Sequence, residues 1–358
     1  MTEQLRVIDG GLRPARRHVA FGQALIDRHR TGDIADTLRF ARFEPAALVA
    51  RDQPLYDKVA VDWCRGQGVA VARRLGGGAT LYAGPGQLGW ELVAAHGRLG
   101  GGALDELLER AGAMVADALA GLGVEARFQP PGRIECDGRR LGVLGGFRRG
   151  GTVYLQGLLL LDLEAGELLR LLTVPAHRLA RRSLAGAAAR LVTLEDRLEG
   201  RRPADDEVQQ ALAGAAGRLL GLPPVFAPAE AAEEAQADRL HDAEFGTEAY
   251  VDRVVLPAGG RSGSAGRSDG GATISAHVTL SAGMAPVVER ALFTGTLLIS
   301  PPDALDTLAA RLAGQPAAAA LAIADRFFAG TAVESIGLSP DDLCAVLAAA
   351  IAQARNRG

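Results

Sequence analysis

The chain has 358 residues, of which 48% are hydrophobic and 4% aromatic, and its formal net charge at pH 7 is −3. This length favours two or three domains with cores of Ala, Leu and Val, and without a domain-wide basic stripe nucleic acid is not a favoured partner. No apolar run approaches the roughly 20 residues that cross a bilayer, and the N-terminus has no apolar signal core, so we expect a cytoplasmic protein with no membrane partner.

The first half of the chain alternates between predicted strands and helices. Residues 1–50 are predicted to be helical at first and then extended, and 69–74 and 88–94 are predicted as strands. Apolar residues at helical spacing, with two acidic residues in the first turn, predict an amphipathic helix over 102–122. In 133–144 an Asp-Gly pair is a strong signal for a two-residue hairpin turn.

The later elements predict the end of one domain and the start of another. A central strand is expected over 152–163 and helices over 184–198 and 205–221. The stretch 221–238 is rich in Pro, Ala and Glu and is predicted to be a linker. Beyond it we expect a small domain with a Gly/Ser loop at 258–271, strands near 250–256, 272–282 and 288–299, and helices near 302–313, 317–329 and 340–354.

Cysteine and histidine spacing argues against a structural metal cluster. Cys64, Cys136 and Cys344 are far apart and odd in number, which disfavours a disulfide framework and a zinc site. The six histidines show no metal-ligand spacing. Lys58 is the single lysine beside 38 arginines, so the basic residues are almost all arginine.

Residues 73–93, "RRLGGGATLYAGPGQLGWELV", raise the question of what the dense glycines approach. The letters "GPGQLG" match a dinucleotide fingerprint, but they contain proline and lead into a predicted strand instead of a helix. A Walker A loop is excluded because no Gly-Lys-Ser/Thr follows. Taken alone, the stretch is interpreted as a pair of tight turns.

Joined to its surroundings, this stretch resembles the core motif of the lipoate–protein ligase and octanoyltransferase family. The ligases carry Arg-Arg-x-Ser/Thr-Gly-Gly-Gly, and the octanoyltransferases carry Thr-Tyr-His-Gly-Pro-Gly-Gln-Leu. The chain fits both without a gap, at Arg73, Arg74, Gly77, Gly78, Tyr82, Gly84, Pro85, Gly86, Gln87 and Leu88. Further similar elements follow in the family's order, at 50–53, 137–142, 155–162, 191–198 and 287–300.

The resemblance implies an α/β (α+β) fold of the biotin/lipoate ligase type, in which helices flank a mixed β-sheet. It implies a catalytic domain over 1–222, a linker over 223–237 and a small α+β accessory domain over 238–358. The implied activity attaches lipoate or octanoate to a lysine of a lipoyl carrier domain through an acyl-adenylate, with ATP and Mg²⁺ as cofactors. No convincing carboxylate pair for Mg²⁺ is visible in the sequence.

By resemblance, Arg140 takes the place of the family's catalytic lysine. The implied substrate-binding residues are Arg51, Arg73, Arg74, Gly76, Gly77, Gly78, Tyr82, Gly86, Gln87 and Gln156. Glycines would let backbone N–H groups approach a carbonyl and a phosphate, and guanidinium groups would supply charge there. The alternative for the arginine pair 73–74 is a solvated basic pair at a strand end.

Several departures from the family pattern leave the reaction open. Arg140 either does the lysine's electrostatic work, or marks a site that binds without catalysis, or is a solvated hairpin residue. Val143 replaces a glycine, Ala83 replaces a histidine, and Ala176 stands where octanoyltransferases carry a nucleophilic cysteine. Cys136 is more often a buried hydrophobe than a nucleophile. His177 could act as a base, although such a histidine more often caps or packs. A catalytically inactive relative that binds an acyl ligand or a carrier domain is therefore the alternative function.

Overall fold

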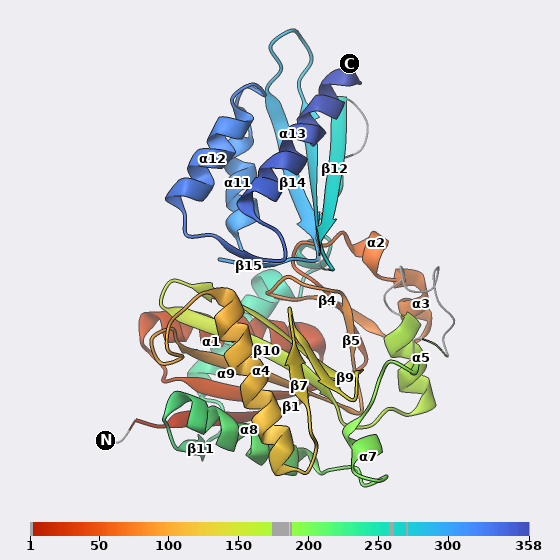
Figure 1. Cartoon of the computed structure of the whole chain (residues 1–358), viewed down its shortest axis with the longest axis vertical. Coiled ribbons are helices and arrows are strands. Elements are labelled where there is room, and N and C mark those ends of the chain that lie inside the picture. The colour runs from red at the N-terminus through yellow and green to blue at the C-terminus, as the bar shows by residue number, and fades with distance from the viewer. Residues whose placement is uncertain (1–2, 174–185, 187, 258–260, 270, 358) are drawn as a thin grey trace. The chain divides into compact units, whose positions relative to one another are not determined.

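The computed structural model describes residues 3–173, 186, 188–257, 261–269 and 271–357. The chain forms two compact units (Figure 1). The first comprises 1–49, 55–75 and 80–251, and the second comprises 50–54, 76–79 and 252–358. None of the described helices is long and apolar enough to cross a membrane.

The first unit is built on an eight-stranded mixed sheet with the order β11-β1-β2-β6-β10-β9-β8-β7. β1 pairs in parallel with β11 and β2, whereas the remaining neighbours are antiparallel. The strands are β1 (Leu5–Arg13), β2 (Thr37–Phe43), β6 (Gln87–Ala95), β7 (Arg127–Gln129), β8 (Arg133–Cys136), β9 (Arg139–Arg149), β10 (Thr152–Leu160) and β11 (Pro224–Phe226).

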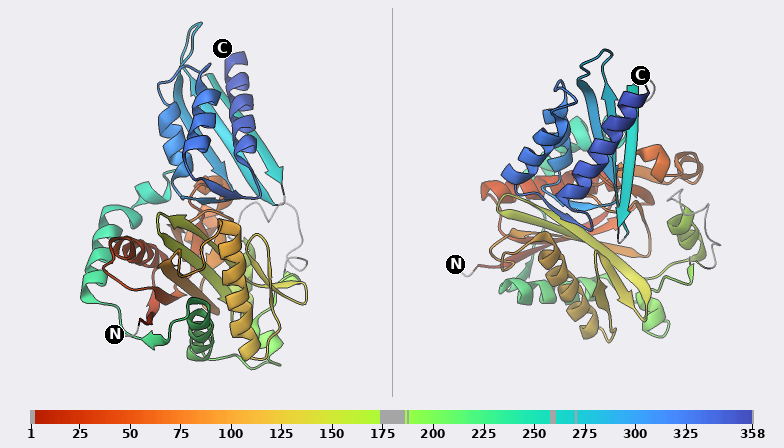
Figure 2. Two further views of the ribbon diagram at one scale, coloured as in Figure 1. Left: turned by 60° about the vertical axis from the view of Figure 1, so that its left-hand side comes forward. Right: turned by 45° about the horizontal axis from the view of Figure 1, so that its top comes forward.

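Helices cover both faces of this sheet (Figure 2). On one face lie α4 (Leu104–Gly121) and α8 (Asp205–Leu220), and on the other lies α1 (Ala15–Thr31). α4 confirms the predicted amphipathic helix, because its apolar stripe from Leu104 to Leu119 is buried. Among the described residues of this unit, the shorter helices are α2 (Leu55–Lys58), α3 (Val61–Gly66), α5 (Ala165–Thr173), α7 (Leu194–Arg197), α10 (Glu248–Val251) and a π-helical turn, η2 (His241–Phe245).

A second, three-stranded sheet lies within the first unit, with the order β4-β3-β5. β3 (Ala46–Val49) pairs in parallel with β4 (Ala70–Arg73) and antiparallel with β5 (Leu81–Ala83). Small side chains of this sheet pack with Leu158 of β10 in one apolar cluster. This packing brings β5 near the large sheet and creates the wall of the cavity described below.

The predicted linker is a structured part of the first unit. It contains β11 and α9 (Ala231–Leu240), and α9 contacts α1. Arg13 donates two hydrogen bonds to the carboxylate of Glu234, at 2.8 and 2.7 Å, and Arg6 pairs with Glu233, which is fully buried. The acidic residues that suggested a linker therefore pair with arginines of β1, and the unit boundary lies at Val251–Asp252.

The second unit has an antiparallel sheet with the order β12-β13-β14 and an apolar core formed with three helices. Its elements are β12 (Arg261–Asp269), β13 (Ala272–Leu280), β14 (Val288–Gly295), β15 (Leu298–Ser300), α11 (Ala304–Leu312), α12 (Ala320–Gly330), β16 (Glu334–Ile336) and α13 (Pro340–Asn356). The three helices confirm the predicted ones.

Four expectations differ from the structure. The chain opens with β1 instead of a helix, and 258–271 contains β12 instead of a loop. Gly and Ser lower strand propensity, yet nine residues of β12 pair with β13, so tertiary pairing overrides composition. Residues 250–256 form no strand, and in the described part of 184–198 residues 186 and 188 and α7 are helical, whereas 189–193 are not.

Candidate functional site

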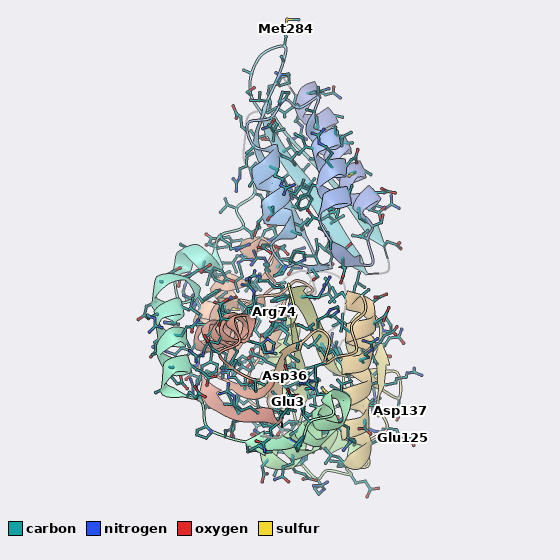
Figure 3. All side chains as sticks on the ribbon, turned by 90° about the vertical axis from the view of Figure 1, so that its left-hand side faces the viewer. Glu3, Asp36, Arg74, Glu125, Asp137 and Met284 are labelled. Carbon is teal, nitrogen blue, oxygen red and sulfur yellow. The ribbon has the colours of Figure 1, made fainter. Side chains whose placement is uncertain are left out.

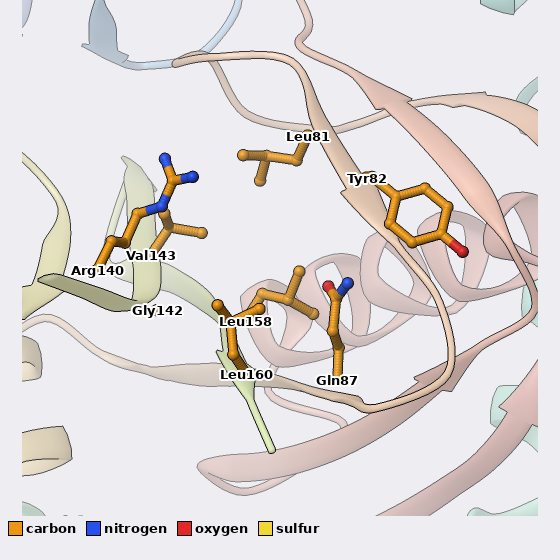
Figure 4. A pocket seen from close by; sticks show the side chains of 8 residues that line it. All are labelled: Leu81, Tyr82, Gln87, Arg140, Gly142, Val143, Leu158 and Leu160. Atoms are coloured by element: carbon orange, nitrogen blue, oxygen red, sulfur yellow. The ribbon is translucent and has the colours of Figure 1, made fainter. Parts of the chain in front are cut away.

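A cavity lies in the first unit between β5, β6, β9 and β10 (Figure 4). Its enclosed volume is about 30 Å³, and the space counted together with the adjoining open solvent is about 360 Å³. Eight described residues line it: Leu81, Tyr82, Gln87, Arg140, Gly142, Val143, Leu158 and Leu160. Of these, Arg140 alone is charged and four are aliphatic. Such a cavity suits an apolar ligand that carries a polar or anionic group at one point.

Strand register places Gln87, Val143, Leu158 and Leu160 on one face of the large sheet. Gln87 of β6 lies opposite Leu160 of β10, and Leu158 lies opposite Val143 of β9. Because side chains alternate across a strand, Leu158 and Leu160 share a face. β10 therefore forms the apolar floor, and the polar residues Gln87 and Arg140 come from the strands on either side of it.

The β8–β9 hairpin holds Arg140 in place. Its turn is the predicted Asp-Gly pair, with φ of 49° at Asp137 and 72° at Gly138, and Figure 3 shows Asp137 at the periphery of its unit. The backbone N–H of Arg140 donates to the carbonyl of Arg190 at 2.8 Å, and its carbonyl accepts from Val192 at 3.1 Å. The hairpin residue is thus fixed by backbone bonds, and its side chain lines the cavity.

The Gly-Pro-Gly-Gln turn connects two walls of the cavity. It carries the chain from β5 to β6. At Gly86 φ is +80°, and a Cβ would clash with the carbonyl of Asp162, whose backbone N–H donates to Gly86 at 3.1 Å. A Cβ at Gly84 would clash with the side chains of Tyr82 and Glu167. Gly86 is therefore required by its backbone conformation and its backbone contact, whereas Gly84 packs closely against two side chains.

The first glycine run belongs to the second unit, not to the cavity. The N–H of Gly78 donates to the carbonyl of Leu297 at 3.0 Å, and a Cβ at Gly77 would clash with the same oxygen. The carbonyl of Gly76 accepts from the N–H of Arg51 at 3.0 Å. The close neighbour of these glycines in the structure is therefore protein backbone.

Arg51 also lies in the second unit. Its guanidinium pairs with Asp306 at 2.5 Å and lies 3.7 Å from the carboxylate of Asp52. The Arg51 side chain is 11% exposed. The structure brings Arg51 to these carboxylates and does not bring it to the lining of the cavity.

The arginine pair 73–74 is not solvated. Arg73 is 1% exposed, and its guanidinium donates to the carbonyls of Tyr250 and Val251 at 3.2 to 2.6 Å, at the end of α10. Arg74 is half-buried, and burial lowers the pKa of its guanidinium to about 10, opposed by Tyr154. Figure 3 labels Arg74 within the first unit. Neither side chain lines the cavity.

Of two further predicted substrate-binding residues, Tyr82 lines the cavity and Gln156 does not. The ring of Tyr82 lines the cavity, but its hydroxyl points away from the cavity (Figure 4) and donates to Glu167 of α5. Burial and this bond raise the pKa of Tyr82. Gln156 lies opposite Glu91 and is 3.4 Å from the hydroxyl of Tyr154, so it borders a separate polar cluster.

That polar cluster is the main feature that the sequence did not indicate. Arg39 of β2, fully buried, donates to Glu91 of β6 at 2.8 Å and to Nδ1 of His18 at 2.5 Å. The hydroxyl of Tyr154 donates to Glu91 at 2.9 Å, and Nε2 of His18 donates to the carbonyl of Arg42 at 2.8 Å. Burial, and then the charge of Arg39, hold the pKa of His18 well below its usual range. In the sequence, the only indication of this cluster is that one charged residue lies in each of two predicted extended segments: Arg39 in the later part of 1–50 and Glu91 in 88–94.

Of the positions considered as a nucleophile or a base, the structure describes Cys136 alone. Cys136 is 2% exposed, and burial raises the pKa of its thiol, so it behaves as a buried hydrophobe. Ala176 and His177 lie outside the described residues. Within the described ranges, no group of three or more His, Cys, Asp or Glu side chains is arranged to hold a metal ion.

Comparison with known proteins identifies the family. The family model of the lipoyl protein ligase A/B catalytic domain matches residues 14–216, more than half of the chain. An octanoyltransferase, LipM, of Symbiobacterium thermophilum is 28% identical over 269 residues, covering 69% of this chain and 97% of that protein.

Solved structures show the same fold. The bipartite lipoate protein ligase of Thermoplasma acidophilum superposes with a TM-score of 0.61 at 19% identity, covering 72% of this chain and 99% of that one. P. falciparum LipL1 in complex with lipoate superposes with a TM-score of 0.69 at 11% identity, covering 92% and 95%. The predicted mixed α/β fold of the biotin/lipoate ligase type is confirmed, and the chain belongs to the lipoyl protein ligase A/B catalytic-domain family.

Proposed function

We propose that this protein is an acyltransferase that attaches an octanoyl or lipoyl group to a lysine of a lipoyl carrier domain. The observation that supports this most directly is the cavity, where Leu81, Leu158 and Leu160 surround a space that one guanidinium borders. An aliphatic acyl chain matches the leucine walls, and its carbonyl oxygen matches the guanidinium. Family membership supports the same class of substrate.

The chemistry assigned to the chain is electrostatic. Arg140 carries a fixed positive charge at a mostly apolar site, where it stabilises negative charge that develops on the acyl oxygen during attack by an amine. The leucine walls exclude water, which strengthens that interaction and protects an activated acyl group from hydrolysis. The backbone bonds on both sides of Arg140 hold its Cα in place, as such a role requires.

ATP and Mg²⁺ are expected from the resemblance, and the described residues fit them only in part. Arg140 lies at the cavity and could meet a phosphate, whereas Arg51 is paired with Asp306 and Arg73 binds two backbone carbonyls. No described carboxylate cluster is arranged for the metal. No step of the proposed mechanism therefore runs through ATP, and the acyl group is taken to arrive in activated form, as an adenylate or as a thioester.

A second candidate is a relative that binds the acyl group without transferring it. The observations that favour it are Arg140 in place of the family's lysine, and Val143, whose side chain fills part of the cavity where the family has glycine. Arg is bulkier and forked, so the exchange is not conservative at a polar site.

The test is acylation of a purified lipoyl domain, followed by intact mass. One arm supplies octanoate or lipoate with ATP and Mg²⁺, and the other supplies an octanoyl thioester of an acyl carrier protein. A mass gain on the lipoyl domain in either arm supports the proposal and identifies the activated donor. No mass gain in either arm contradicts it. Transfer that appears only in Arg140→Lys would favour the relative that binds without catalysis.

A further inference from the structure

The side chain of Gln87 is the most unusual polar group of the cavity. Gln87 is 3% exposed, and neither its Nε2 nor its Oε1 has a hydrogen-bond partner among the described residues. Figure 4 shows the amide directed into the cavity, near Leu158 and on the opposite side from Arg140. Buried amides are normally hydrogen-bonded, so both atoms call for a partner that the described protein atoms do not provide.

The fold itself does not need this amide. The position of Gln87 in the sheet is set by its backbone pairing with Leu160. Its side-chain neighbours around the cavity, Leu81, Leu158 and Leu160, are aliphatic, so an apolar side chain of similar size would pack there without leaving a buried polar group unsatisfied. A residue that is unfavourable for folding and directed into a cavity points to a ligand.

The chemistry of the amide restricts that ligand. Nε2 donates and Oε1 accepts, so a ligand that satisfies both atoms must present an acceptor and a donor side by side. A carboxylate, a thioester and an acyl phosphate present acceptors only. An amine attacking an acyl carbon presents both: the acyl oxygen accepts, and the N–H of the amine donates.

We propose that Gln87 is a catalytic residue that aligns the acceptor lysine with the acyl group; this inference rests on the proposed function. Nε2 donates to the acyl oxygen, and Oε1 accepts an N–H of the neutral lysine amine. The nitrogen lone pair forms the C–N bond. The bond between the acyl carbon and its activating group breaks, and the leaving group departs with that electron pair and takes up the proton lost by nitrogen. The products are the amide and the protonated leaving group.

Arg140 complements Gln87 in this arrangement. β6 and β9 lie on either side of β10, and neighbouring strands are about 4.8 Å apart, so the two backbones are roughly 10 Å apart. Both side chains line the same cavity and can approach one acyl oxygen from opposite sides. Gln87 differs from Arg140 in that it can also contact the amine.

The experiment measures how the acyl group is divided between the lipoyl-domain lysine and water. Activated donor is mixed with the lipoyl domain and the full chain, and amide and hydrolysed acid are both quantified. Gln87→Met keeps side-chain size and removes both hydrogen bonds. We expect amide formation to fall about 100-fold and the ratio of amide to acid to fall at least 10-fold. Gln209→Met is the matched control, because Gln209 is 4% exposed in the same unit and does not line the cavity; its ratio should not change.

The possible outcomes are distinguishable. A Gln87→Met protein with wild-type rate and ratio overturns the inference alone and indicates that the amide is satisfied by water. A raised KM with an unchanged ratio also overturns it, since Gln87 then only holds the acyl group. A wild-type protein that forms no amide with any donor overturns the proposed function and this inference together. Gln87→Glu provides a further check, because it keeps the acceptor and loses the donor, and it should not restore the rate.

Discussion

Gln87 and Glu91 lie four residues apart on β6, and their surroundings differ sharply. Glu91 is 8% exposed and accepts hydrogen bonds from Arg39 and Tyr154. Gln87 is 3% exposed, and its side-chain amide has no hydrogen-bond partner among the described residues. A satisfied buried polar cluster can serve the fold, whereas an unsatisfied amide directed into a cavity serves a ligand. Under the proposed function, the difference separates residues that hold this sheet together from residues that act on the substrate.

The largest expected effect concerns Glu91, the residue of this pair that is assigned to the fold. Glu91→Leu leaves the buried guanidinium of Arg39 without this carboxylate, and we expect the free energy of unfolding to fall by about 3–5 kcal/mol. Urea unfolding followed by circular dichroism measures it. Glu109→Leu, on the exposed face of α4, should stay within about 0.5 kcal/mol of wild type.

A double variant sharpens this result. Arg39→Met combined with Glu91→Leu removes both charges, so part of the lost stability should return. If Glu91→Leu alone is as stable as the wild type, the polar cluster of Arg39, Glu91 and His18 does not stabilise the fold. The contrast between Glu91 and Gln87 would then be wrong.

The next largest effect concerns Arg140 at the cavity and is a loss of acyl-transfer rate. Arg140→Ala should reduce acyl transfer about 10²–10³-fold, equivalent to about 2.7–4 kcal/mol of transition-state stabilisation, with little change in stability. The measurement is the initial rate of lipoyl-domain acylation. Arg139→Ala is the neighbouring control, since adjacent strand residues point to opposite faces and Arg139 is not among the cavity-lining residues. Equal losses in both variants would mean that a general positive charge on the hairpin matters, not the guanidinium at the cavity.

A smaller effect concerns pH and His18. The pKa of His18 is well below its usual range in the folded chain, so below about pH 6.5 the unfolded chain binds a proton that the folded chain does not. Stability should therefore be complete above pH 6.5 and fall at lower pH, by at most about 1.4 kcal/mol per pH unit from this group. Unfolding free energies at pH 7.5, 6.5 and 5.5 test this. His18→Gln should show a shallower decline than the wild type, and parallel curves would contradict the assignment.

Periodic elements could be predicted from the sequence, and long-range partners could not. The helix α4, the hairpin turn at 137–138 and the strands β6 and β10 follow from local patterns of apolar and turn residues. The cluster of Arg39, Glu91 and His18 depends on the pairing of β2 with β6 and on the packing of α1, which a local pattern does not encode.

The glycine stretch 73–93 shows the same limit within one motif. The resemblance drew attention to Arg140 and Gln87, and in the structure both side chains line the cavity. It treated all the glycines alike, however, whereas Gly77 and Gly78 approach the backbone of Leu297 and Gly86 packs on Asp162. Which backbone a glycine approaches depends on residues more than 70 positions away, so spacing alone could not separate the two roles.

The most direct test of the central claim measures two properties of Gln87→Met side by side: its free energy of unfolding and its rate of acyl transfer. If the amide serves the substrate, stability stays the same or rises by up to about 1–2 kcal/mol, because a buried unsatisfied group is removed, while the transfer rate falls about 100-fold. A variant that loses stability but transfers the acyl group at the wild-type rate would contradict the account, because Gln87 would then belong to the fold in the same way as Glu91.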